Sequence, residues 1–293
     1  MEDILTALAS RLKQKDNSAN KGTNGTLTVA AGSELYRGAA ALASSAALRC
    51  GVGIVRLVSV EKVISSAAAR LPECVFLPTE SENGAMSYRD FKRKMPAFSK
   101  SRAVLAGCGM TDCTDTGNII AELIKYGGYQ LIIDADGLNS IKNRPELLKS
   151  AALPPVITPH IGEMARLTGA SADAIKSDRE NTAAEFSRKY NCITVLKDCK
   201  TVISSPEGKL FVCDRPNAGL AKGGSGDVLS GIISSFAAQG YDAFDAAVCG
   251  AALHSLAAES AREKLTEYSM LPSDIVAEIP GVFARIGKTR NYR

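Results

Sequence analysis

The sequence predicts an α/β fold in which helices cover both faces of a mostly parallel β-sheet. Short apolar runs alternate along the chain with helical stretches, many of them alanine-rich. Strands that alternate with helices form βαβ units, whose strands are buried on both faces and therefore apolar throughout. Of the 293 residues, 45% are hydrophobic and 23% are charged, which is ordinary for a globular protein. This composition excludes a disordered chain and a fibre.

The predicted strands are short apolar runs, most of which end at Gly, Asp, Pro or Lys. They cover residues 27–31, 53–59, 103–106, 130–134, 156–158, 192–196, 201–204 and 210–213. The last two flank a Pro-Glu-Gly turn at 206–208 and are expected to form a hairpin. No element is predicted between residues 71 and 102.

The predicted helices lie between and after these strands, where alanine and leucine recur among polar residues. They cover residues 39–49, 62–70, 116–125, 145–149, 162–167, 178–190, 227–238, 242–262 and 272–285. Ligands of such sheets bind at the carboxyl ends of the strands. The residues that directly follow the strands are therefore the first candidates for a functional site.

The first 22 residues predict a short amphipathic helix, with Ile4, Leu8 and Leu12 on its apolar face, and a polar linker. Residues 23–293 are predicted to form a single catalytic domain, because no repeat or low-complexity segment divides them. The acidic residues Glu2 and Asp3 are atypical of a signal peptide, and no apolar stretch is long enough to cross a membrane. We therefore expect a cytoplasmic protein without a membrane partner.

Charge and cysteine content exclude further classes of function. The net charge of +4 is too small to indicate nucleic-acid binding, and aromatic residues amount to only 5%. The eight cysteines include no CxxC pair, so a zinc site is not indicated. Cys108 and Cys113 are the closest pair and could form a redox pair, although reduced thiols in a cytoplasmic protein are the simpler interpretation.

The strongest local signal is a cluster of three glycines, Gly223, Gly224 and Gly226, around Ser225 at the start of a predicted helix. Glycine allows the main chain to approach an anion closely, and the first N–H groups of a helix point toward it. Asp227 falls in the first turn of that helix. A simple helix cap is the alternative, but a cap needs one Ser or Asp and not three glycines. The cluster therefore predicts a phosphate-binding loop, although it matches neither GxxxxGK[ST] nor GxGxxG.

Three further motifs precede this cluster: LIIDADGLN at 131–139, TPHIGE at 158–163 and KDCKT at 197–201. Together, from about residue 21 to about residue 285, they resemble the ADP-dependent NAD(P)H-hydrate dehydratases. The resemblance implies a ribokinase-like fold, a three-layer α/β/α sandwich with a mostly parallel central sheet. It also implies dehydration of the S epimer of NADHX or NADPHX, with ADP or ATP as co-substrate and Mg²⁺ as cofactor. In that chemistry the ring hydroxyl is phosphorylated and phosphate then leaves.

The resemblance also implies roles for individual residues. The residues expected to contact the hydrated coenzyme are Ala39, Gly109, His160 and the catalytic residue, Asp227. The residues expected to bind the nucleotide are Lys197, Asp198, Cys199, Lys200, Thr201, Gly223, Gly224, Ser225 and Gly226. Glu163 is expected either to act on Mg²⁺ through water or to be a first-turn acid of the next helix.

Several of these residues have simpler structural interpretations. A lone histidine such as His160 is often structural, and we expect His254, inside an alanine-rich helix, to be a core residue. Asp134 and Asp136 could order the site, hold Mg²⁺ through water, or only cap a strand end. A carboxylate at a helix N-terminus is stabilised as the anion, so Asp227 is expected to be a weak base.

The chain departs from the pattern of the family at three positions. Asp198 and Thr111 stand where glycine is usual, and Lys222 stands where a small residue is common. Two other functions stay open: a small-molecule kinase of the hydroxymethylpyrimidine or thiazole type, and a nucleotide-binding module without activity. We also expect a homo-oligomer, with a tetramer as one form. A separate NAD(P)HX epimerase is the expected functional partner.

Overall fold

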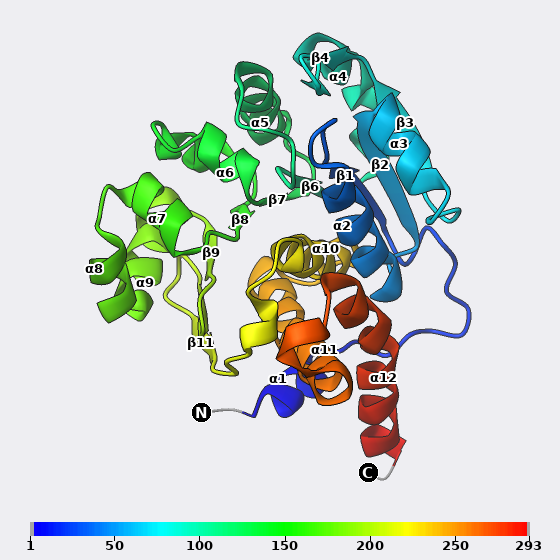
Figure 1. Cartoon of the computed structure of the whole chain (residues 1–293), viewed down its shortest axis with the longest axis vertical. Helices are drawn as coiled ribbons and strands as arrows, with labels where there is room; N and C mark the ends of the chain where they lie inside the picture. Colours follow the sequence, from blue (N-terminus) through cyan, green and yellow to red (C-terminus); the bar gives the residue numbers. More distant parts are fainter. Residues whose placement is uncertain (1–2, 292–293) are drawn as a thin grey trace.

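A nine-stranded sheet runs through the protein (Figure 1). The structure is a computed structural model, which describes residues 3–291 and the side chains of residues 3–287. The strand order is β11-β10-β9-β8-β7-β6-β1-β2-β3. The bounds are β1 (Thr26–Ala30), β2 (Ile54–Val60), β3 (Val75–Thr79), β6 (Ala103–Ala106), β7 (Gln130–Ile133), β8 (Val156–Ile157), β9 (Ile193–Leu196), β10 (Thr201–Ser204) and β11 (Leu210–Cys213).

The strands from β9 to β3 pair in parallel, and the predicted hairpin of β10 and β11 adds two antiparallel strands at one edge. Every residue of β1, β6 and β9 is buried, as continuous apolar runs predict for strands covered on both faces. The mostly parallel sheet predicted from the sequence is therefore confirmed.

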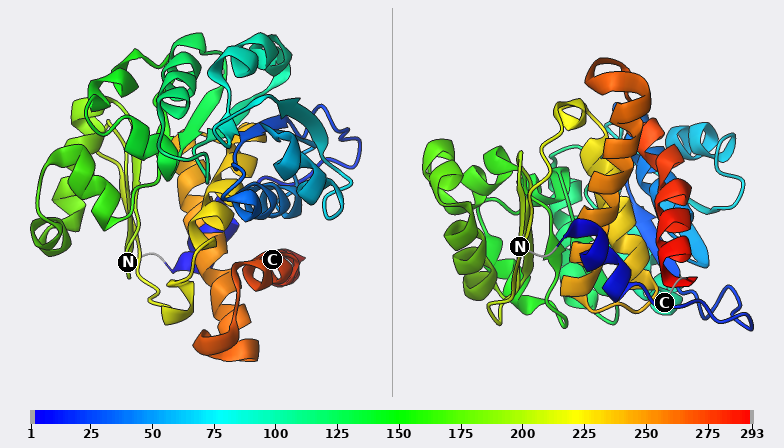
Figure 2. Two further views of the ribbon diagram at one scale, coloured as in Figure 1. Left: turned by 45° about the horizontal axis from the view of Figure 1, so that its top comes forward. Right: turned by 90° about the horizontal axis from the view of Figure 1, so that it is seen from below.

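Two layers of helices enclose the sheet. On one face α2 (Arg37–Arg49), α10 (Ser225–Ala238) and α11 (Ala243–Ser269) pack together, with α1 (Ile4–Arg11) and α12 (Pro272–Asn291) against α11. Figures 1 and 2 show α5 to α9, in green, on the other side of the sheet from α10 to α12, in yellow to red. The remaining helices are α3 (Glu61–Ala68), α4 (Tyr88–Lys94), α5 (Thr114–Tyr126), α6 (Asp136–Ser140), α7 (Ile161–Thr168), α8 (Ala172–Ser177) and α9 (Arg179–Tyr190), with the 3₁₀ turns η1 (Met95–Lys100), η2 (Pro145–Ser150) and η3 (Ala218–Leu220).

The sequence prediction missed the segment between residues 71 and 102. It contains β3, the small hairpin of β4 (Ser81–Glu82) and β5 (Ala85–Met86), and α4. The strand β3 lies at the edge of the sheet and exposes Val75 and Pro78, although residues 74–78 form an apolar run like those of the predicted strands. Among the described helices, none combines the length and the apolar character needed to span a membrane.

The sheet brings several chain segments to one edge, the carboxyl ends of its parallel strands. Asp134 follows β7 and Lys197 follows β9. The first turn of α10 meets them there, because a Cβ added to Gly226 would lie 3.3 Å from Lys197 Nζ and 3.7 Å from Asp134 Oδ2. The glycine cluster and the strand ends, far apart in the sequence, therefore form one site.

Candidate active site

The glycine cluster forms the sharp entry into α10. Gly224 is the N-cap residue and has a φ of 103°, a conformation that L side chains rarely adopt. A Cβ there would also lie 2.6 Å from Leu42 Cδ1. Ser225 begins the helix and Asp227 lies in its first turn. This geometry is that of a glycine-rich loop whose N–H groups can face an anion.

A cavity of about 800 Å³ opens on one side of this turn. Its cationic side chains, Lys176, Lys197, Arg215 and Lys222, suit a polyphosphate. The residues predicted to bind nucleotide that line it are Lys197, Asp198, Cys199, Thr201, Gly223, Gly224, Ser225 and Gly226. Lys200 is not in the lining, and its Nζ pairs instead with Asp214 at 2.6 Å.

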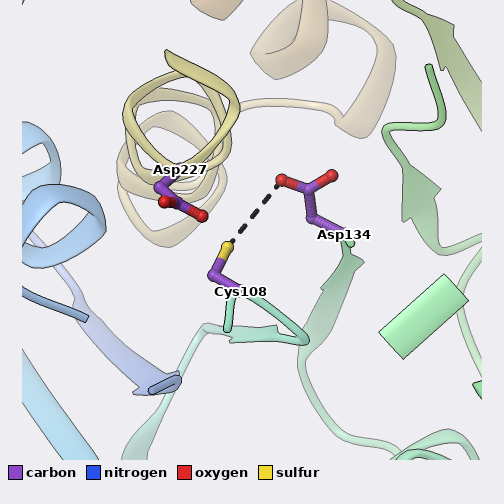
Figure 3. A group of neighbouring side chains, drawn as sticks. All are labelled: Cys108, Asp134 and Asp227. Atoms are coloured by element: carbon purple, nitrogen blue, oxygen red, sulfur yellow. Dashed lines mark hydrogen bonds between the residues drawn. The ribbon is translucent and has the colours of Figure 1, made fainter. Parts of the chain in front are cut away.

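A cluster of two carboxylates and a thiol lies beside the same turn, as Figure 3 shows. Ligand atoms of Cys108, Asp134 and Asp227 all lie within 4.8 Å of one another. Asp134 is 1% exposed, and its Oδ1 accepts a 2.8 Å hydrogen bond from Lys197 Nζ. Its Oδ2 accepts from Ser230 Oγ at 2.5 Å and lies 3.8 Å from Cys108 Sγ. The pair of buried Asp134 and half-buried Lys197 thus joins the carboxylate cluster to the cavity.

The pKa values of the two carboxyl groups in this cluster are shifted in opposite directions. Burial, together with the charge of Asp134, raises the pKa of Asp227 to about 6. Burial also acts to raise the pKa of Asp134, but the Lys197 ammonium and hydrogen bonds outweigh it and hold that pKa below the usual value. The expectation that Asp227 is a weak base is therefore wrong, because burial and the charge of Asp134 raise its pKa.

His160 and Glu163 cap the start of α7 in a reciprocal arrangement. His160 Nδ1 accepts from the main-chain N–H groups of Gly162 at 2.9 Å and Glu163 at 3.3 Å, while a Glu163 carboxylate oxygen accepts from His160 N at 2.8 Å. Burial lowers the pKa of His160 and raises that of Glu163 to about 7. The cap gives His160 a structural role, and His160 also lines the cavity, so its contact with the hydrate stays a prediction.

Ala39 and Gly109, the other two residues predicted to contact the hydrate, lie against each other. A Cβ on Gly109, whose φ is 61°, would lie 2.8 Å from the Cβ of Ala39 and 2.7 Å from that of Tyr36. Gly109 follows Cys108, so this contact continues from the carboxylate cluster. Neither residue lines the 800 Å³ cavity, and neither does Asp227. The predicted hydrate-binding residues, His160 apart, thus lie outside the predicted nucleotide cavity.

Comparison with known proteins agrees with this geometry. A model of the NAD(P)H-hydrate dehydratase family matches residues 27–281. The chain belongs to that family. An ADP-dependent (S)-NAD(P)H-hydrate dehydratase of Xanthomonas campestris is 30% identical over 97% of both chains. A bifunctional NAD(P)H-hydrate repair enzyme of Moorella thermoacetica is 32% identical over 97% of this chain but only 54% of its own length, so the chain spans about half of such relatives.

Solved structures confirm the predicted fold. The ADP/ATP-dependent NAD(P)H-hydrate dehydratase of Bacillus subtilis, co-crystallised with ATP and Mg²⁺, superposes with a TM-score of 0.82 at 26% identity, covering 95% of this chain and 96% of that one. A ribokinase-like superfamily protein of Enterococcus faecalis has a TM-score of 0.83 at 23% identity, covering 96% of this chain and 94% of the other. The three-layer ribokinase-like fold is therefore the fold of this chain.

Two departures from the family pattern have local explanations. The carboxylate of Asp198 accepts hydrogen bonds from the Arg179 guanidinium, so its charge is paired at the rim of the cavity. Lys222 Nζ donates to the main-chain carbonyls of Tyr268 and Met270, at 2.7 and 2.6 Å. Lys222 thus ties the glycine cluster to the end of α11.

The third departure, Thr111, keeps a backbone conformation that favours glycine. Its φ is 72°, and its N–H donates to Asp136 Oδ2 at 2.9 Å. Its hydroxyl donates to Ser33 Oγ at 3.1 Å. Thr111 thus adopts a glycine-like conformation, and its main-chain N–H and its hydroxyl are both hydrogen-bonded.

The sequence prediction missed three side chains of the site. Ser230 was not considered, although it lies one helical turn beyond Gly226 on the face of α10 that meets Asp134. Cys108 was considered only for redox pairing with Cys113. Both thiols are free, and Cys108 is completely buried, with a raised pKa. His254 is buried as predicted, but it also lines the cavity.

The donor set of the carboxylate cluster does not suit Mg²⁺. This ion prefers several oxygen ligands and retains water, whereas Asp134 is occupied by Lys197 and Ser230 and the third ligand is a thiol. Glu163 is 5% exposed, its oxygens face His160, and it does not line the cavity, so the structure shows it as the first-turn acid of α7, while its contact with Mg²⁺ through water stays a prediction. Mg²⁺ bound to the phosphates of a nucleotide is compatible with this arrangement.

Proposed function

We propose that this chain catalyses the ADP- or ATP-dependent dehydration of (S)-NADHX and (S)-NADPHX to NADH and NADPH. The observation that carries the proposal is the position of the first turn of α10. On one side, this turn faces a cationic cavity that suits a polyphosphate. The turn also carries Asp227, which lies outside that cavity and whose pKa of about 6 suits proton transfer at neutral pH. Membership of the dehydratase family supports the same assignment.

The reaction requires a better leaving group than hydroxide. The ring hydroxyl oxygen attacks the terminal phosphorus of the nucleotide, the bond to the bridging oxygen breaks, and the hydroxyl proton goes to Asp227. The ring C–O bond of the phosphate ester then breaks, and phosphate leaves with the bonding electrons, driven by the lone pair of the adjacent ring nitrogen. Loss of a proton from the neighbouring carbon restores the ring double bond. The net products are the reduced coenzyme, inorganic phosphate and a nucleotide shortened by one phosphate.

The protein contributes positioning and charge in this mechanism. The main chain of Gly223–Gly226 holds the transferring phosphate, and Lys197 supplies a positive charge at the cavity wall. Asp134 keeps Lys197 protonated despite its burial and fixes the position of its ammonium. Mg²⁺ would be held by the phosphates, with Glu163 as a contact through water, and would supply charge neutralisation on the nucleotide. Ala39, Gly109 and His160 provide the contacts to the hydrated nicotinamide.

The proposal extends to the cellular setting. We place the enzyme in the cytoplasm as a homo-oligomer, with a tetramer as one form, and without a nucleic-acid partner. The bifunctional relatives carry about as much additional chain as this chain contains. A separate NAD(P)HX epimerase, which would convert the R epimer into the S epimer, is therefore the proposed functional partner.

A coupled assay tests the function directly. NADH hydrate is mixed with Mg²⁺ and either ADP or ATP, and the absorbance of reduced nicotinamide is followed together with phosphate release. Recovery of NADH with one phosphate per turnover, at least a hundredfold slower in Asp227→Asn, is the expected result. A stable phosphorylated product without recovery would identify a kinase instead. Nucleotide binding without any product would identify a binding module.

A further inference from the structure

Lys222 directly precedes the glycine cluster and is one of the cationic residues that line the cavity. Its Nζ donates to the main-chain carbonyls of Tyr268, at 2.7 Å, and Met270, at 2.6 Å. These carbonyls lie at the end of α11, where the last C=O groups of a helix have no partner within the helix. An ammonium has three N–H donors, and no acceptor among the described residues engages the third. Lys222 therefore keeps one donor open to a ligand.

The other cationic side chains of the cavity interact with carboxylates. The interactions are ion pairs of Lys197 with Asp134 and of Arg215 with Asp3 and Glu259, and an electrostatic interaction of Lys176 with Asp198. Lys222 differs from them, because it forms no ion pair with any carboxylate of the described residues. Carbonyl dipoles hold its ammonium without cancelling its charge. Lys222 thus gives the cavity a fixed positive charge that no acid neutralises.

The glycine cluster does not need the contacts of Lys222 to stay against the end of α11. A Cβ on Gly219 would lie 2.2 Å from Met270 Sδ, and a Cβ on Gly224 would lie 3.2 Å from Pro272 Cγ. Close packing therefore holds the chain on both sides of Lys222 against the junction of α11 and α12. A neutral residue in place of Lys222 would leave this packing intact. What lysine adds, at a position where a small residue is common in the family, is the charge.

We propose that Lys222 is a polyphosphate-binding residue that shifts the nucleotide preference of this chain toward ATP. With Mg²⁺ bound, ATP carries one more negative charge than ADP, and the attraction to a fixed positive charge grows with the charge of the ligand. The open N–H of Lys222 can also donate to an oxygen of the polyphosphate, since phosphate oxygens are acceptors. This inference rests on the proposed function only in taking a nucleotide as the ligand of the cavity.

The test compares the affinities for two nucleotides of different charge. Dissociation constants of Mg·ADP and Mg·ATP are measured by calorimetry for the native chain, Lys222→Gln and Lys222→Arg. Lys222→Gln removes the charge but keeps a donor. It should weaken Mg·ADP by roughly fivefold and Mg·ATP by roughly twenty-fivefold, because the lost free energy scales with the charge of the ligand. Lys222→Arg keeps the charge, so both affinities should stay within about threefold of native.

Salt separates an effect of charge from an effect of packing. Raising the ionic strength to about 0.5 M should bring the affinities of Lys222→Gln and of the native chain closer together, since salt screens a partly exposed charge. A difference that does not change with salt would contradict a role of the charge and overturn the proposal.

The matched control is Lys13→Gln, which removes the same charge outside the cavity. Lys13 Nζ also donates to a main-chain carbonyl, that of Gly240 at 2.7 Å, but Lys13 does not line the cavity. Lys13→Gln should bind both nucleotides as the native chain does. Equal losses of affinity in Lys13→Gln and Lys222→Gln would show an effect of net charge alone and would overturn the proposal.

Melting temperatures distinguish a purely structural role of Lys222. A lowered melting temperature of Lys222→Gln, with equal losses of affinity for both nucleotides, would make Lys222 a structural tie and overturn the proposal. Native affinities in Lys222→Gln would overturn it as well but leave the proposed function intact, because no hydrate is present in the titration. A native chain that binds neither nucleotide would contradict the inference and the proposed function together.

Discussion

The two sides of the first turn of α10 differ in charge, exposure and chemistry. The cavity side is open and cationic, lined by main-chain glycines, Lys197 and Arg215. The other side is small and acidic, with Asp134 and Asp227 around a buried thiol. A site that must bind a polyphosphate and also accept a proton needs both environments, and a helix N-terminus can divide them. The pair of buried Asp134 and half-buried Lys197 is the direct link between the two sides.

Breaking that link should have the largest effect on stability. In Asp134→Asn, the half-buried Lys197 ammonium loses its counter-charge and a charge-assisted hydrogen bond, which should destabilise the protein by about 2–3 kcal/mol. Urea unfolding at neutral pH measures the change. The matched control is Asp112→Asn, which breaks an ion pair of similar length, 2.7 Å, between the more exposed Asp112 and Lys142. Its expected effect is about 1 kcal/mol or less. Equal losses for the two variants would contradict the account.

The acidic side should also give the enzyme a characteristic dependence on pH. The pKa values of Asp227 and Glu163, about 6 and about 7, lie above those of an unfolded chain. Between pH 4 and these values the folded state binds more protons than the unfolded state, so the stabilisation from the protonated forms is lost as pH rises. The stability of the native chain relative to the double variant Asp227→Asn/Glu163→Gln should therefore fall from pH 4 to pH 8. Parallel stability curves would show that the two carboxyls are not perturbed.

A smaller effect is expected at the rim of the cavity, where Arg179 pairs with Asp198. Arg179→Ala leaves the carboxylate unpaired near the polyphosphate, so the dissociation constant of Mg·ADP should rise roughly threefold. Asp198→Ala frees a positive charge and should lower it by a similar factor. Titration of both single variants and the double variant measures the coupling. If the dissociation constant of Mg·ADP changed in the same direction in both single variants, the charge of Asp198 would not explain its effect on nucleotide binding.

The smallest effect concerns Thr111, whose φ of 72° is unfavourable for a residue with a side chain. Thr111→Gly removes this strain but loses the hydrogen bond to Ser33 and adds freedom to the unfolded chain. The net change should be a gain of less than about 1 kcal/mol, seen as a small rise in melting temperature. A clear loss of stability would show that the hydroxyl of Thr111 matters more than the strain.

Much of the fold was predictable because its signals are local. Each buried parallel strand is an apolar run, and a Pro-Glu-Gly turn marks the hairpin of β10 and β11. The edge strand β3 was missed although residues 74–78 are an apolar run, because its proline is atypical of a strand inside a sheet. The charged helix α4 was missed as well. Its sequence, YRDFKRK, has only Asp90 and Phe91 buried.

The members of the site were more predictable than their interactions. The motifs led to Asp227, His160 and the glycine cluster, which the structure brings to the carboxyl ends of the strands. The contact of Asp134 with Lys197 joins residues 63 positions apart, and no local pattern encodes it. The raised pKa of Asp227 depends on burial by distant segments, so the local argument from the helix dipole gave the wrong sign.

The most direct test of the division between the two sides uses Asp227→Asn in two assays. Affinity for Mg·ADP reports the cavity side, and NADH recovery from its hydrate reports the acidic side. The account predicts a dissociation constant within about threefold of native together with turnover reduced at least a hundredfold. Loss of nucleotide affinity in the same proportion as turnover, or turnover that survives the substitution, would contradict it.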